Sequence, residues 1–195
     1  MRYSIASCLF GLMLLWVSTA QPSNSQSVEP YADGDALAVY RTLIPSPVDR
    51  KDLLIVTTTE NPTAWACKGL ADAKGPSGDY ADALADLLRV NHQEWRLESL
   101  LQSEKAKFIS QAELRSLFRG NVEKGWKKFY KKHPSASGYI SFSAVGFNRT
   151  HTIAAVYIAM MSCSECGHGS IQFLKVGLNG WEKVAPPFST CDWIT

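Results

Sequence analysis

The 195-residue chain lacks a strong excess of either charge, and it lacks internal repeats. Its 20 Lys and Arg residues nearly balance 18 Asp and Glu residues, for a net charge of +2, so its overall charge predicts no nucleic-acid partner. Nine prolines and 13 glycines follow no three-residue period, which excludes collagen, and no longer period indicates a solenoid. With 46% apolar residues, the chain is too hydrophobic to be disordered throughout.

The common catalytic motifs are also missing. The sequence contains no G-x-S-x-G, no H-E-x-x-H and no phosphate-binding loop. Of the four histidines, only His168 lies next to a cluster of other ligand-type residues. We therefore predict no catalytic residue and no cofactor, and favour a non-enzymatic protein. An enzyme stays open as an alternative, because many active sites assemble from residues far apart in the sequence.

The first 20 residues predict export. Arg2 supplies a positive start, Ile5 to Val17 are mostly apolar, and Ser18-Thr19-Ala20 place small residues where a signal peptidase cleaves. The apolar run is short for a membrane span, although an uncleaved anchor is the alternative. We expect a mature chain that begins at Gln21 and lies in the periplasm or outside the cell.

Few cysteines remain after the signal, and their number is even. Cys8 lies inside the predicted signal, and an even count in an oxidising compartment favours disulfides. We predict a local bond between Cys163 and Cys166. A second bond would join the N-terminal half of the chain to its last strand. The four cysteines after the signal are Cys67, Cys163, Cys166 and Cys191, which leaves Cys67 and Cys191 for that second bond.

The segment Cys163-Ser-Glu-Cys166-Gly-His168-Gly169 is the sharpest local motif. A c-type haem site is excluded because Gly167 separates the second cysteine from the histidine. Three interpretations remain: a structural disulfide that closes a turn, a redox-active dithiol, and a zinc site. In the zinc site, Cys191 or Cys67 would complete the ligands Cys163, Cys166 and His168. We favour the structural disulfide.

The order of the elements predicts one α+β domain. Residues 21–34 are polar and predict a flexible leader before a single globular domain over 35–195. Apolar spacing predicts a helix over 35–44, and the β-branched run 53–59 predicts a buried strand. After a loop at 61–78 the middle is predicted to be helical: one apolar stripe runs from Tyr80 to Leu101, and a capping box opens another helix at Ser110.

The last third changes to the period of strands. Four runs, 139–147, 152–161, 170–176 and 181–185, are separated by short turns. Since such short connections join antiparallel neighbours, we predict N-terminal helices with one buried strand, followed by a four-stranded antiparallel meander. Residues 152–161 are apolar on both faces, so this strand should be central.

A lysine-rich helix is predicted around Trp126. Its aromatic residues recur at helical spacing and indicate a buried stripe, whereas its lysines lie on the opposite side. We interpret this side as a solvated face, with contact to an anionic surface as the alternative. The lysines are Lys124, Lys127, Lys128, Lys131 and Lys132.

Several segments of the second half resemble a group of uncharacterised exported bacterial proteins. The resemblance covers about residues 36–195 and implies a bacterial, exported α+β domain, but it implies no activity and no catalytic residues. His133 stands where a Tyr is usual, and Gln172-Phe173 replaces a more aromatic start of a strand. The matching segments are Gly125-Trp126, Phe129-Tyr130, His133-Pro134, Gly138-Tyr-Ile-Ser-Phe-Ser143, Val145-Gly-Phe-Asn148, Ala155-Val-Tyr157, Cys166-Gly-His-Gly169, Trp181-Glu-Lys-Val184 and Trp193-Ile194.

These features together favour a non-enzymatic binding or structural domain of the bacterial envelope. Its ligand would be a protein, a glycan or a small apolar molecule held between sheet and helices. The alternative is a metal- or thiol-dependent protein that uses the turn of Cys163, Cys166 and His168.

Overall fold

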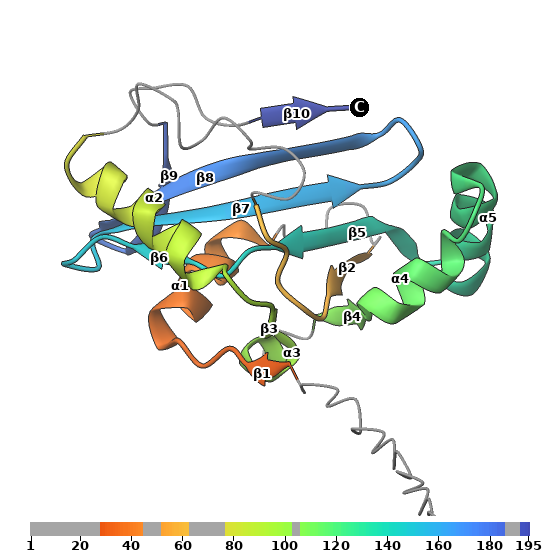
Figure 1. Cartoon of the computed structure of the whole chain (residues 1–195), viewed down its shortest axis with the longest axis horizontal. Helices are drawn as coiled ribbons and strands as arrows, with labels where there is room; N and C mark the ends of the chain where they lie inside the picture. The colour runs from red at the N-terminus through yellow and green to blue at the C-terminus, as the bar shows by residue number, and fades with distance from the viewer. Residues whose placement is uncertain (1–27, 45–51, 63–76, 103–105, 186–191) are drawn as a thin grey trace, which may run out of the picture.

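A mixed β-sheet of eight strands is the central element of the computed structural model, which describes residues 28–44, 52–62, 77–102, 106–185 and 192–195 (Figure 1). The strand order is β10-β8-β7-β5-β2-β4, with β6 also paired to β7 and β9 to β8. The strands are β2 (Asp52–Val56), β4 (Lys107–Ile109), β5 (Ala136–Phe142), β6 (Gly146–Phe147), β7 (Ile153–Met161), β8 (Gly167–Gly177), β9 (Gly180–Val184) and β10 (Asp192–Ile194).

The predicted four-stranded antiparallel meander is therefore wrong. The predicted runs correspond to β5 with β6, β7, β8 and β9, and these do pair antiparallel. However, β2 pairs parallel with both β5 and β4, so the sheet is mixed and larger than predicted. Parallel neighbours need long crossover connections. The pairing partners are then tens of residues apart, and no turn signal between them marks the pairing.

Strand β7 separates the two faces of the core. Alternate side chains along a strand point to opposite faces. Accordingly Ala154, Val156 and Ile158 belong to one hydrophobic cluster, whereas Ala155 and Tyr157 belong to another. The strand lies between β5 and β8, as expected from its apolar residues on both faces.

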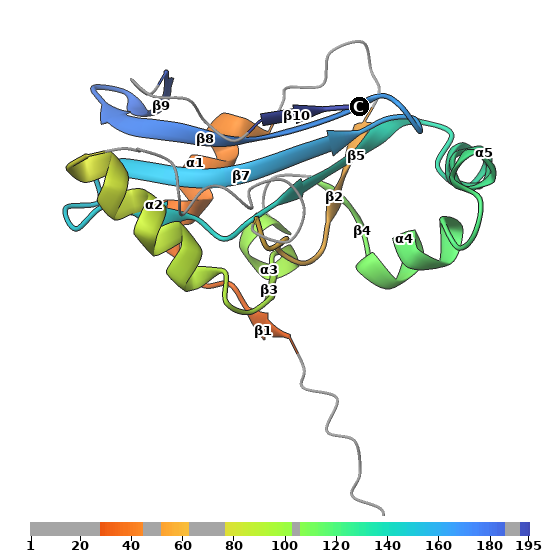
Figure 2. The same ribbon diagram turned by 45° about the horizontal axis from the view of Figure 1, so that its top comes forward.

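Helices cover both faces of the sheet. On one face, α1 and α3 pack with the side chains of Ile140 and Phe142. On the other, α2 covers one end and α4 with α5 cover the opposite end (Figures 1 and 2). The helices are α1 (Gly34–Leu43), α2 (Asp79–Val90), α3 (Glu98–Leu101), α4 (Gln111–Leu117) and α5 (Val122–Lys132).

The apolar stripe predicted from Tyr80 to Leu101 is not one continuous helical region. Helix α2 ends at Val90, and Asn91 caps it. The buried Asn91 side chain donates to the Leu87 and Ala144 carbonyl groups and accepts the Ala144 N–H. The chain then enters the two-stranded parallel sheet of β1 (Glu29–Pro30) and β3 (Trp95–Arg96) before α3. This long-range bond between a side chain and the backbone outweighs the local helical pattern.

Side-chain caps begin α4 and α5, at the end of the sheet opposite α2. Ser110 accepts the Glu113 N–H at the start of α4, which is one half of the predicted capping box, and Asn121 accepts the Lys124 N–H at the start of α5. The Glu113 carboxylate contacts Lys132 and His133. Trp126 stacks on Tyr139 of β5 with ring centroids 5.8 Å apart. The aromatic stripe of α5 is thus core, as expected from its spacing.

The residues just before α1 also belong to the described structure. Residues 28–34 fall within the predicted leader, yet they contain β1, the buried Tyr31 and Asp33, which caps α1. The Tyr31 hydroxyl accepts the Val145 N–H at 3.1 Å. Within the described residues, no helix is both long and apolar enough for a membrane crossing.

Candidate binding groove and the predicted sites

A groove of about 520 Å³ lies between α2 and the turn that joins β6 to β7. This volume falls in the range of small-ligand sites in proteins. Aromatic and charged side chains from four separate segments line it, and we call it the α2 groove. Its lining residues are Tyr31, Asp33, Asp82, Ala85, Asp86, Arg89, Val90, Trp95, Val145, Phe147, Asn148, Arg149 and His151.

Close contact between α2 and β6 forms one wall of the groove. Gly146 lies so near the helix that an added Cβ would be 2.5 Å from the Ala83 carbonyl oxygen and from the Leu87 Cα. Asp86 Oδ2 then accepts the Phe147 N–H at 3.0 Å. Asp86 thus satisfies a backbone donor of β6 and ties α2 to this strand.

The turn after β6 is held by one buried side chain. Asn148 Oδ1 accepts the N–H groups of Thr152 and Ile153 at 2.8 and 2.9 Å. In the same turn His151 adopts φ 53°, which is uncommon for a residue other than glycine. The His151 ring stacks on Phe147 with centroids 4.7 Å apart. The turn therefore presents a fixed aromatic pair to the groove.

The acidic groups of the groove are held more firmly than its cations. Asp33 accepts two N–H groups at the start of α1, and Asp86 is fixed by Phe147. Arg89 and Arg149, with side chains 71% and 88% exposed, pair only at the surface with Asp86 and Asp82. Such exposed pairs contribute little free energy, so both guanidinium groups can move away from the groove.

The pKa of Tyr31 reflects both the burial of its hydroxyl and the charges around it. Burial raises the pKa of Tyr31 well above its usual value, and the nearby charges of Asp33 and Asp86 raise it further, while Arg89 opposes them. With three aspartates against two arginines among its lining residues, the α2 groove carries a small formal excess of negative charge.

Sequence reasoning missed the α2 groove. The one local signal was the spacing of Asp82, Asp86 and Arg89 at i, i+4 and i+7, which places them on one helix face. Tyr31, Trp95 and His151 come from distant segments, and only the fold brings them together.

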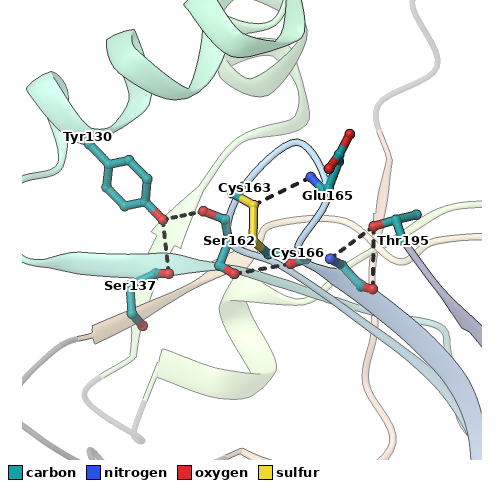
Figure 3. Close-up of a disulfide and its surroundings, with 8 residues drawn as sticks. Tyr130, Ser137, Ser162, Cys163, Glu165, Cys166 and Thr195 are labelled. Atoms are coloured by element: carbon teal, nitrogen blue, oxygen red, sulfur yellow. Dashed lines mark hydrogen bonds between the residues drawn. A yellow bond between two sulfur atoms is a disulfide. The ribbon is translucent and has the colours of Figure 1, made fainter.

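The predicted cysteine turn closes the hairpin between β7 and β8 (Figure 3). Cys163 and Cys166 are at disulfide distance, with Sγ atoms 1.93 Å apart, as the sequence predicted. The Tyr130 hydroxyl on α5 donates to the Ser162 and Ser137 carbonyl groups, at 2.6 and 3.1 Å. Thr195 Oγ1 accepts the Gly167 N–H at 3.0 Å. The turn therefore links β5, α5 and the end of the chain.

The described residues do not form the metal site that the sequence offered as an alternative. Disulfide-bonded sulfurs are not thiolate ligands, and His168 is exposed on β8. Within these ranges, no three His, Cys, Asp or Glu residues are grouped as a metal site would require. Cys67 and Cys191, proposed as a second disulfide or as additional ligands, lie outside the described residues.

The lysine-rich helix agrees with its predicted faces. Trp126 and Phe129 are buried, and the lysines of α5 are all exposed. Lys132 pairs with Glu113 at 2.8 Å, and the same carboxylate accepts from His133. We call Lys124, Lys127, Lys128, Lys131 and Lys132 the lysine face.

A second charged site, absent from the sequence-based predictions, lies on the sheet. Glu60 is hydrogen-bonded by the Ser141 hydroxyl of β5. Burial raises the pKa of Glu60, and the Ser141 hydrogen bond lowers it only in part. Burial also raises the pKa of Tyr139 to about 12, with the charge of Glu60 as a further cause. The carboxylate of Glu60 is thus poorly compensated in the folded state.

We expect Glu60→Gln to stabilise the fold at neutral pH. A pKa raised by folding means that the folded state disfavours the charged form, so stability falls as the pH rises above the usual carboxyl value of 4.5. Glutamine keeps an acceptor for Ser141 and carries no charge. Thermal unfolding should therefore show a higher Tm than wild type at pH 7, with the difference vanishing near pH 3.

Glu113→Gln is the matched control with the opposite sign. The hydrogen bond from Lys132 lowers the pKa of Glu113, so its charged form stabilises the folded state at neutral pH. This variant should melt below wild type at pH 7 and converge with it in acid. Equal Tm shifts for the two variants at pH 7 would contradict the assignment of the Glu60 charge as destabilising.

No protein-family model matches the chain, and neither the curated proteins nor the solved structures contain a match. The resemblance to exported bacterial proteins therefore stays a prediction from the sequence.

Proposed function

We propose that this chain is an exported, non-enzymatic binding protein of the bacterial envelope and that the α2 groove is its ligand site. The observation that carries the proposal is the pairing of aromatic walls with fixed aspartates in a groove of about 520 Å³. Its ligand would carry a cationic group, such as the guanidinium or ammonium of a partner protein's side chain. Export rests on the N-terminal sequence.

Charge complementarity supports a cationic ligand. Asp33 and Asp86 keep their positions through backbone hydrogen bonds, so their charges need no reorganisation when a ligand binds. Arg89 and Arg149 are mostly exposed, and a cation entering the groove can displace them into water. The half-buried Trp95 ring also lines the groove, and the faces of aromatic rings attract cations.

A peptide probe tests the proposal. We expect N-acetyl-Gly-Arg-Gly amide to shift the backbone NMR resonances of residues 82–90 and 145–151, and the neutral isostere N-acetyl-Gly-citrulline-Gly amide to leave them unchanged. The double variant Asp82→Asn, Asp86→Asn should weaken arginine-peptide binding about tenfold, since each exposed ion pair contributes up to about 1 kcal/mol.

Glu123→Gln is the control, because it removes one negative charge from exposed α5 at the other end of the sheet. Binding should be unchanged in this variant. Equal shifts from the citrulline peptide, or shifts confined to other segments, would refute the α2 groove as a site for cations.

A further inference from the structure

The lysine face forms a continuous basic stripe on α5. Lys124, Lys127, Lys128 and Lys131 are spaced i, i+3, i+4 and i+7, so their side chains emerge on the same side of the helix. All are exposed, whereas Trp126 and Phe129 on the opposite side are 6% and 0% exposed. The buried aromatic residues hold the helix in place, and the stripe is therefore rigidly oriented.

Intramolecular interactions account for only part of this stripe. Among the described residues, Lys132 pairs with Glu113 and no acidic group lies within 4.0 Å of the other four ammonium groups. Lys131 and Lys132 are in the last turn of α5, where the helix dipole favours cations. The same dipole disfavours Lys124 near the N-terminal end. Helix stability therefore does not explain the N-terminal half of the stripe.

The stripe lies at the end of the sheet opposite α2 (Figures 1 and 2). Exposed Arg115 on the neighbouring α4 and exposed Arg119 just after it add to its positive charge, and Glu123 is the acidic residue on α5. The α2 end carries Asp79, Asp82 and Asp86. Seven of the chain's 20 Lys and Arg residues thus lie at the α4–α5 end, whereas the aspartates of α2 share their end with Arg89 and Arg149.

We propose that the lysine face docks on the surface of an anionic phospholipid bilayer. The charge of the face is complementary to anionic headgroups, and its lysines form a convex row on a helix rather than a pocket that would select one small anion. Each lysine near an anionic membrane strengthens binding about fivefold. Docking through α5 would turn the α2 end away from the bilayer. The proposal therefore does not depend on what the α2 groove binds.

Vesicle cosedimentation tests this docking with the purified mature chain. We expect binding to vesicles of 70% phosphatidylcholine and 30% phosphatidylglycerol at low salt, and none to pure phosphatidylcholine. Raising the salt should release the protein, because exposed charges are screened within about 10 Å at 0.1 M. The double variant Lys127→Gln, Lys131→Gln should bind about 25-fold more weakly, as expected for two lysines at about fivefold each.

Lys175→Gln with Lys183→Gln is the matched control, since it removes the same charge from exposed positions on β8 and β9. It should bind like the wild-type chain. Equal losses in both double variants would assign the binding to net charge and overturn the proposal. Failure to bind the anionic vesicles would also overturn the proposal, as would binding of soluble polyphosphate without binding of vesicles. Asp82→Asn, Asp86→Asn should leave vesicle binding intact, which separates this test from that of the groove.

Discussion

Gly146→Ala is expected to destabilise the chain by about 3 kcal/mol, at the upper end of what overpacking a core costs. The new methyl group would overlap the backbone of α2, at Ala83 and Leu87. Backbone atoms cannot rotate away as a side chain can, so α2 would have to shift from the sheet. Denaturant unfolding should show a lower midpoint with an unchanged slope.

The same shift of α2 should also weaken ligand binding in the α2 groove. The hydrogen bond from Phe147 N–H to Asp86 Oδ2 depends on the close approach of α2 to β6. We therefore expect the arginine-peptide shifts to be lost together with stability. Gly34→Ala is the control, because an added Cβ there meets no atom within 4 Å and the helical backbone of α1 favours alanine. If Gly146→Ala were as stable as Gly34→Ala, the close α2–β6 contact would be refuted.

Asn148→Ala is expected to cost about 3 kcal/mol. Its Oδ1 accepts two backbone N–H groups, from Thr152 and Ile153, and the residue is 1% exposed. Alanine leaves both donors without their partner, and an unsatisfied buried group costs about 1–3 kcal/mol. Chemical denaturation measures this loss, and amide hydrogen exchange should show faster exchange at Thr152 and Ile153.

Thr150→Ala serves as the control for Asn148. It removes one partner of the Asn148 amide and leaves the bond to Thr152 and both accepted N–H bonds. We expect a loss well below that of Asn148→Ala. Equal losses would show that the hydroxyl network, rather than the two backbone bonds, holds the turn.

Local patterns predicted the parts of the fold that depend on neighbouring residues. The Ser110 cap opens α4, the aromatic spacing around Trp126 forms the buried side of α5, and the motif at Cys163 forms a local disulfide. Each depends on residues within about two helical turns or one hairpin. Side-chain spacing and the bonding capacity of those residues were sufficient to predict them.

Local patterns failed where distant segments compete for the same backbone groups. The run after Tyr80 has helical spacing, yet Asn91 bonds to Ala144 and ends α2. The strand β4 has only three residues, and its parallel pairing with β2 has no sequence signature. These choices are decided by hydrogen bonds between segments about 50 residues apart, which no periodicity within one segment encodes.

The sequence by itself determined the charge balance, the lysine stripe, the paired cysteines and the presence of the strands that became β7 and β8. Only the tertiary structure decided that these strands belong to a mixed sheet and that α2 packs on β6 at Gly146. It also decided that Asp33, Asp86 and Tyr31 meet at one groove. The physical reason is that composition and periodicity act along the chain, whereas packing and long-range hydrogen bonds select which segments meet.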